Sequence, residues 1–122
     1  MQVPVQISFH GVDHSDAVEE RIRDKVEKLE KFDSAMVSCR VVVETHHKNT
    51  ANTHKKGEPY HIRIDVGVPG DELVVKRQPK DAHAHEDILT AINDAFRKME
   101  EQVKEYSRRR KDHPGGKPAA AM

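Results

Sequence analysis

The 122-residue sequence is poor in aromatic residues, and it contains a single cysteine and no long hydrophobic run. With Cys39 alone no intrachain disulfide can form, and its alternating segment predicts a small buried hydrophobic side chain rather than a reactive thiol. The longest aliphatic run, Val41-Val42-Val43, is far shorter than a membrane span. The N-terminus also lacks the basic start and apolar segment of a signal peptide. These absences predict a soluble cytoplasmic protein without a membrane partner.

The sequence also has no net charge, because it contains 21 residues of Lys plus Arg and 21 of Asp plus Glu. Any argument for nucleic-acid binding must therefore come from how the charges are arranged and not from their sum. The sequence contains no glycine-rich phosphate loop, no G-x-S-x-G motif and no Cys–His motif. We therefore predict that the protein is not an enzyme, holds no cofactor and takes no small-molecule substrate.

Apolar and polar residues alternate in three segments, which cover Val3–Phe9, Met36–Glu44 and Tyr60–Val68. A period of two residues is typical of β-strands with one face in water. Pro69-Gly70 favours a type II turn, because proline presets φ and glycine accepts a positive φ. Leu73–Lys76 should then be the returning strand of a hairpin.

Two further segments have helical periodicity. Ser15 is a candidate N-cap for a helix that ends near Phe32, and a second helix should run from about Glu86 to Arg109. The apolar stripe of the first helix consists of Val18, Ile22, Val26 and Leu29. The stripe of the second consists of Ile88, Ile92, Phe96, Met99, Val103 and Tyr106. Each stripe should pack on a sheet.

This element order, β-α-β-β-β-α, predicts an α+β domain over residues 1–111. It should have two layers, with two roughly parallel helices packed on one face of a four-stranded mixed sheet. The first helix can cross over between two parallel strands, and the later strands connect as hairpins. The core should contain Cys39, Val41, Ile22, Val26, Ile64, Ile92, Phe96 and Met99. Residues 45–59 and 78–85 should be loops, and residues 112–122 a disordered tail.

Both helices sort their charges. On the first, Arg21, Lys25 and Lys28 share one flank of the apolar stripe, while glutamates occupy the other flank and the outer side. Such a pattern fits either a phosphate-binding flank or a solvated face held by i,i+4 pairs such as Glu27–Lys31. The second helix ends in the cations Lys104, Arg108, Arg109, Arg110 and Lys111. Cations there complement the helix dipole, but four in a row can also neutralise phosphates.

Histidines suggest a metal site, because His83 and His85 precede Glu86 and Asp87. Zinc does bind imidazole and carboxylate groups. However, the sequence contains no cysteine pair and no H-E-x-x-H pattern. We therefore predict no bound metal and expect these imidazoles to cap the second helix or to be solvated.

Two helical segments carry a family resemblance. Residues 87–102, DILTAINDAFRKMEEQ, resemble the D-x-x-x-A-I-(D/N)-x-x-x-x-K-(L/M)-x-x-Q signature of hibernation-promoting factor and ribosome-associated inhibitor A. This family is also labelled ribosomal subunit interface protein. Residues 25–32, KVEKLEKF, resemble its K-x-x-K-L-E-x-aromatic segment. The resemblance covers residues 2 to 111 and is closest to the short form, because the tail is too short for the extra C-terminal domain of long-form members.

The resemblance implies binding to the small ribosomal subunit and its rRNA at the decoding centre, where mRNA and tRNA sites would be occluded. By position, Lys25, Lys28 and Lys98 match family lysines, and we expect them to form one cationic surface where the helices adjoin. The full predicted RNA-binding set is Arg21, Lys25, Lys28, Lys98, Arg108, Arg109, Arg110 and Lys111. Glu101 and Glu105 depart from the family pattern, because many members have Arg or Lys at these positions.

A protein–protein adaptor is the alternative function. It would regulate another factor through the charged sheet face that carries His61, Arg63 and Asp65. The zero net charge and the two glutamate departures favour it. Co-sedimentation with ribosomes separates the two hypotheses.

Overall fold

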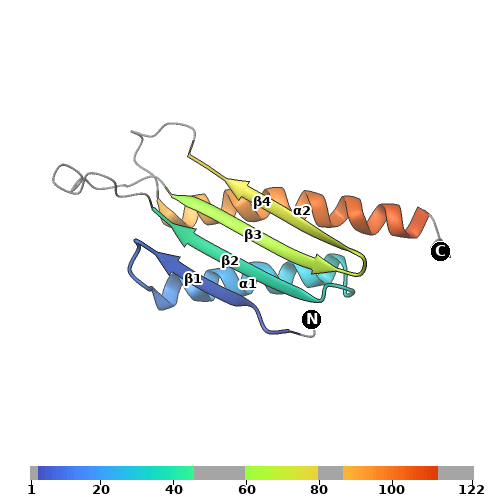
Figure 1. Ribbon diagram of the computed structural model, residues 1–122, viewed down its shortest axis with the longest axis horizontal. Helices are drawn as coiled ribbons and strands as arrows, with labels where there is room; N and C mark the ends of the chain where they lie inside the picture. The colour runs from blue at the N-terminus through green and yellow to red at the C-terminus, as the bar shows by residue number, and fades with distance from the viewer. Residues whose placement is uncertain (1–2, 46–59, 80–86, 113–122) are drawn as a thin grey trace.

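The computed structural model describes residues 3–45, 60–79 and 87–112, which form four strands and two helices (Figure 1). Their order is β1 (Gln6–His10), α1 (Asp16–Phe32), β2 (Ser38–Glu44), β3 (His61–Val68), β4 (Asp71–Arg77) and α2 (Ile88–Asp112). This order confirms the predicted β-α-β-β-β-α fold. Most of the predicted loop at 45–59, of the predicted connection at 78–85 and of the predicted tail at 112–122 lies outside the described residues, at 46–59, 80–85 and 113–122.

The sheet is mixed and has the strand order β1-β2-β3-β4. β1 pairs with β2 in parallel, so α1 is the crossover between them, as predicted. β2 pairs with β3, and β3 with β4, in antiparallel fashion. Gly70 in the β3–β4 turn has φ +79°, the left-handed value that a type II turn needs at this position.

Local interactions set where the elements begin. Ser15 has extended backbone angles, and its Oγ accepts a hydrogen bond from the Val18 amide, which confirms it as the N-cap of α1. Asp87 caps α2 in the same way, because its Oδ2 accepts from the Thr90 amide at 3.2 Å. α2 continues to Asp112, three residues beyond the predicted end at Arg109. β1 starts at Gln6 rather than Val3, although the Val3 amide already donates to the Val37 carbonyl at 3.1 Å.

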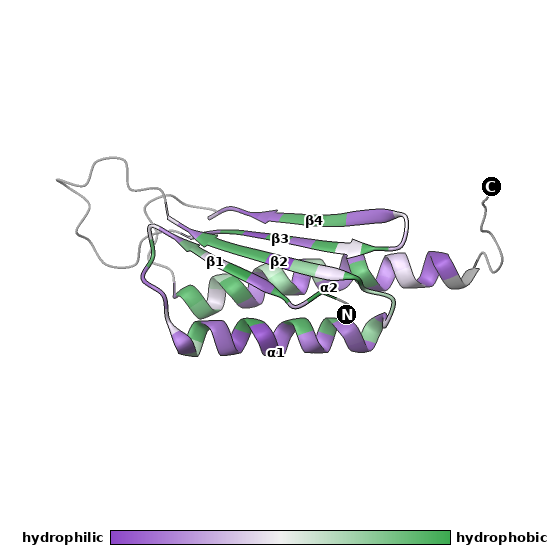
Figure 2. Ribbon diagram, turned by 60° about the horizontal axis from the view of Figure 1, so that its bottom comes forward, coloured by the Kyte–Doolittle hydropathy of each residue, from purple (hydrophilic) through white to green (hydrophobic). Residues whose placement is uncertain are grey.

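Both helices cover the same face of the sheet and run in the same direction (Figures 1 and 2). The core lies between the layers. All eight residues predicted for the core are buried, each with at most 3% of its surface exposed. These residues are buried because the two-residue period of the strands and the 3.6-residue period of the helices give each strand one apolar face and each helix one apolar stripe. Neither described helix is long and apolar enough to cross a membrane.

Candidate RNA-binding surface

A groove of about 310 Å³ separates the two helices. Its lining residues are Lys25, Lys28, Leu29, Asn93, Phe96, Arg97 and Glu100, and we call it the interhelix groove. Leu29 and Phe96 belong to the core that packs on the sheet, so they form the floor. The groove therefore opens on the side of the helices that faces away from the sheet. Its charged lining consists of three cations and one carboxylate.

Polar contacts across the interhelix groove hold the cations in place. Arg21 Nη1 donates to Asn93 Oδ1 at 3.2 Å, and Lys28 Nζ lies 3.9 Å from Glu100 Oε2. Lys104 Nζ lies 4.6 Å from the centroid of the Phe32 ring, in a cation–π contact between the helices. The cationic flank of α1 thus faces α2, and the side chain of Lys28 remains 60% exposed.

Lys98 does not line the interhelix groove. It lines a second hollow of about 470 Å³ on the other side of α2, together with Asp71, Leu73, Glu101, Gln102, Glu105, Tyr106 and Arg109. One residue of helix corresponds to about 100° of rotation, so Arg97 faces α1 while Lys98 turns toward β4. The structure therefore brings Lys25 and Lys28 together with Arg97, which the sequence patterns did not single out. The spacing of Asn93, Phe96, Arg97 and Glu100 is the signal that could have found it.

The basic end of α2 is partly neutralised within the chain. Glu105 pairs with both Arg108 and Arg109, and Arg109 Nε lies 3.1 Å from Glu105 Oε2. These two arginines are still 65% and 73% exposed. The departure from the family pattern at Glu105 thus lowers the charge of the predicted run. The side chain of Lys111 lies outside the described part of the chain.

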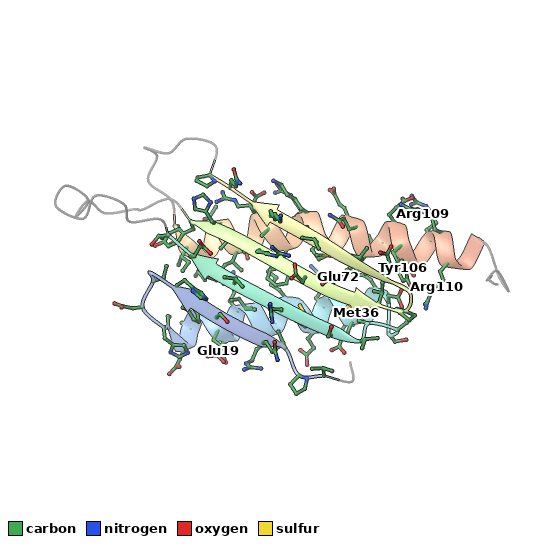
Figure 3. The ribbon with its side chains drawn as sticks, in the orientation of Figure 1. Glu19, Met36, Glu72, Tyr106, Arg109 and Arg110 are labelled. Atoms are coloured by element: carbon green, nitrogen blue, oxygen red, sulfur yellow. The ribbon has the colours of Figure 1, made fainter. Side chains whose placement is uncertain are left out.

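Arg110 differs from its neighbours because its partner is a buried carboxylate outside α2, whereas Arg108 and Arg109 pair with the exposed Glu105 of their own helix. Its Nη2 donates to Asp33 Oδ1 at 3.0 Å, and its guanidinium lies 5.5 Å from the centroid of the Tyr106 ring. The Asp33 carboxylate is only 1% exposed, and it also accepts from the Ala35 amide at 2.9 Å. Figure 3 shows Tyr106 and Arg110 near the end of the molecule where the β3–β4 turn lies. Arg110 therefore compensates a buried charge beside the C-terminus of α1.

The predicted His83–His85 cluster lies outside the described residues. Within the described ranges, potential metal-ligating groups gather at the start of α1, where His14, Asp16 and Glu19 meet. Asp16 approaches Nδ1 of His14 at 3.6 Å, whereas Glu19 approaches Nε2 at 2.7 Å. One ligand atom of each residue lies within 4.8 Å of the others, while the two carboxylates are closest to different ring nitrogens. Hydrogen bonds from His14 and Arg23 lower the pKa of Glu19, so these three side chains form a hydrogen-bonded cluster at the start of α1.

Cys39 is buried in β2, as predicted. Loss of solvation in the core, with smaller contributions from the charges of Asp65 and Glu30, raises the pKa of its thiol to about 12. The thiol therefore stays protonated at neutral pH, and it lacks the thiolate that nucleophilic chemistry requires.

The open face of the sheet carries both signs of charge. Arg63 Nε donates to Asp65 Oδ1 at 3.0 Å, so two of the three residues named for the adaptor hypothesis pair with each other. The charged residues along this face are Arg40, Glu44, Arg63, Asp65, Glu72 and Lys76. With three of each sign, the face has no net charge from these side chains, in contrast to the interhelix groove.

Two solved structures share this two-layer fold. The chain is similar to a ribosomal subunit interface protein from Coxiella burnetii, with a TM-score of 0.64, 16% identity and coverage of 84% of this chain and 94% of that one. It is also similar to the N-terminal domain of Protein Y from Thermus thermophilus, with a TM-score of 0.62, 19% identity and coverage of 87% and 99%. At these identities the similarity establishes the fold alone.

The family follows from the sequence itself. Residues 5–111 match the family described as sigma 54 modulation protein / S30EA ribosomal protein, and the chain belongs to this family. The resemblance noted at residues 25–32 and 87–102 is thereby confirmed, and it places the chain among ribosome-associated factors. No curated protein matches the chain in a sequence comparison.

Proposed function

We propose that this protein binds the small ribosomal subunit in its decoding region and inhibits translation by occluding the mRNA and tRNA sites. The observation that carries the proposal is the interhelix groove, in which Lys25 and Lys28 of α1 and Arg97 of α2 converge on one open surface. Membership in a family of ribosome-associated factors supports the ribosome as the partner. A cytoplasmic location follows from that partner.

The mechanism is binding without catalysis. Lys and Arg side chains neutralise rRNA phosphates, which supplies affinity and position but no sequence reading. Folded rRNA is then recognised by its shape. The rigid two-layer domain fills the space that ligands of translation need, and no cofactor or small-molecule substrate takes part.

The predicted RNA-binding residues take different places in this proposal. Arg21, Lys25 and Lys28 form its centre, together with Arg97. Lys98 and Arg109 border the second hollow and would contact RNA only if it wraps around α2. Arg108 extends the surface along the end of α2, and Lys111 is proposed with it only from its sequence position in the last turn of that helix. Arg110 contributes mainly through its pair with Asp33, so we assign it a structural role first.

Ribosome pelleting across a salt series tests the proposal. The double variant Lys25→Glu/Lys28→Glu should bind about ten- to a hundredfold more weakly at physiological salt. The slope of log affinity against log salt should fall by about 2, because about two phosphate contacts are lost. Inhibition of translation in a cell-free reaction should weaken in parallel. Lys98→Glu, measured alongside, should have a smaller effect than either groove lysine alone.

The matched control is Arg40→Glu/Arg63→Glu, which makes the same change in net charge on the open face of the sheet. It should pellet with ribosomes as the wild type does. If the groove variant pellets as well as the wild type at every salt concentration, the assignment of RNA contacts to the groove is wrong and the adaptor hypothesis replaces the proposed one. The mixed charges of the open face are the observation that favours that alternative.

A further inference from the structure

β4 is an edge strand, and its free edge carries a self-complementary charge pattern. Within the described residues, β4 pairs only with β3. In the tight β3–β4 hairpin, Val68 and Asp71 flank the two-residue turn and exchange backbone hydrogen bonds. The bonding alternates along the strand, so the N–H and C=O groups of Glu72, Val74 and Lys76 point away from β3.

A contact from α2 supports this assignment independently. Gln102 Nε2 donates to the Val74 carbonyl at 3.1 Å, so this carbonyl does face the free edge. The side chains of Glu72 and Lys76 are exposed on the open face of the sheet, and Val74 is half-buried between them. Glu72 is labelled in Figure 3. Every second side chain along this edge thus lies on the open face, in the order acid (Glu72), small apolar residue (Val74) and base (Lys76).

We propose that two copies of this chain associate by antiparallel pairing of their β4 edges, about a two-fold axis at Val74. In this register Val74 lies opposite Val74 of the second copy, and each Glu72 lies opposite a Lys76. Each of these pairs can exchange two backbone hydrogen bonds once two contacts within the chain give way, those of the Glu72 amide with Asp71 Oδ1 at 2.7 Å and of the Val74 carbonyl with Gln102 Nε2 at 3.1 Å. The sheet would then continue through both copies. The proposal does not depend on the proposed ribosomal function.

The charges select this register over its neighbours. Sliding one strand by two residues places a charged side chain opposite Val74. Sliding it by four places Glu72 opposite Glu72, or Lys76 opposite Lys76, which is unfavourable on a sheet. β1, the other edge strand, has the sequence QISFH and offers no such pairing of acid and base.

The surroundings of the edge are compatible with a second copy. The second hollow between β4 and α2 has Lys98, Glu101, Glu105 and Arg109 among its lining residues, two of each sign. A two-fold axis near Gln102 would bring the Lys98 side of one α2 toward the Glu105 side of the other. The interhelix groove lies on the opposite flank of α2, so it would stay open in the dimer.

The test uses the full chain in sedimentation equilibrium over a concentration series. A small interface of this kind predicts a dissociation constant on the order of 10–500 µM. Lys76→Glu and Glu72→Lys should each weaken dimerisation at least about tenfold, because each turns two attractive cross-strand pairs into repulsive ones. The double variant Glu72→Lys/Lys76→Glu should restore it. An equimolar mixture of the two single variants should form heterodimers, because every pair is then of opposite sign.

Lys31→Glu, an exposed charge reversal on α1, is the matched control and should leave association unchanged. Circular dichroism checks that each variant is folded. If one single variant does not fold, the other single variant and the double variant still test the register. A wild-type chain that remains monomeric throughout the series overturns the proposal. So does a dimer that persists in both single variants, because the contact would then lie on another surface.

Discussion

Replacing Arg110 tests whether the basic end of α2 serves the fold as well as RNA. Arg110→Met keeps most of the aliphatic length but leaves the Asp33 carboxylate, 1% exposed, without its cation. Losing a hydrogen bond to a buried charge costs about 1.5–3 kcal/mol. The Arg110 side chain is 44% exposed, so water can replace part of the interaction, and we expect a loss of about 1–2 kcal/mol.

A loss of this size is measurable by thermal melting. For a domain of this size it corresponds to a decrease in Tm of about 4–8 °C. Arg108→Met is the matched control, because Arg108 and Glu105 are both well exposed and such pairs contribute little. The control should melt within about 2 °C of the wild type.

A double-mutant cycle isolates the pair itself. Asp33→Asn can still accept from the Ala35 amide, but it no longer buries a charge that needs Arg110. Combining it with Arg110→Met should show a coupling of about 1 kcal/mol. Additive effects, or a Tm for Arg110→Met as high as that of the control, would refute the assignment. Ribosome pelleting of Arg110→Met at a temperature where it is folded should remain close to wild type.

The buried thiol of Cys39 and the half-buried carboxylate of Asp94 give further predictions. Cys39, with its pKa raised to about 12, should react with a colorimetric thiol reagent far more slowly in the native protein than after unfolding, and rapid native labelling would show that the strand opens easily. Burial alone would raise the pKa of Asp94, but the hydrogen bond from Arg77 and the charges of Lys98, Arg97 and Arg77 outweigh it and hold the pKa below its ordinary value. The stabilisation is therefore present above about pH 4 and is lost as the pH falls through the lowered pKa. Melting curves of Asp94→Asn should accordingly depend less on pH at the acidic end than those of the wild type.

The fold could be predicted because the two-residue alternation of the strands and the 3.6-residue repeat of the helices are nearly undisturbed in this sequence. The stripe from Val18 to Leu29 and the alternation from Cys39 to Val43 each bury every expected residue. Pro69-Gly70 fixes one hairpin locally. Strand and helix ends were less exact, because they depend on single contacts, such as that of Val3 with Val37.

The candidate surface was only partly predictable. The flank of α1 that carries Arg21, Lys25 and Lys28 follows from a helical wheel. A helical wheel does not show which flank of α2 this cationic flank of α1 meets. Arg97 and Lys98 are both off the apolar stripe of α2, and they lie on opposite sides of it. The choice depends on how α2 sits over β3 and β4 relative to α1, which is a long-range property. Asp33 was also invisible in the sequence, because nothing around it distinguishes a buried carboxylate from a solvated one.

The pairing of charges explains how a chain with no net charge can still present a cationic surface. Several acidic residues are engaged away from the interhelix groove: Asp33 with Arg110, Asp65 with Arg63, and Glu19 with His14 and Arg23. Among the described residues that line the interhelix groove, only Glu100 is acidic, and it lies 3.9 Å from Lys28, at the limit of an ion pair. Arg97 pairs in addition with Asp94 of its own helix, at 2.5 Å and outside the groove lining, so the excess of positive charge rests mainly on Lys25 and Lys28. Electrostatic attraction to phosphates acts over about 10 Å at moderate salt, so it depends on this local excess rather than on the sum over the chain. Removing the Glu100 carboxylate therefore tests the proposal, because an interhelix groove that binds RNA through its cations should bind RNA more tightly without this negative charge.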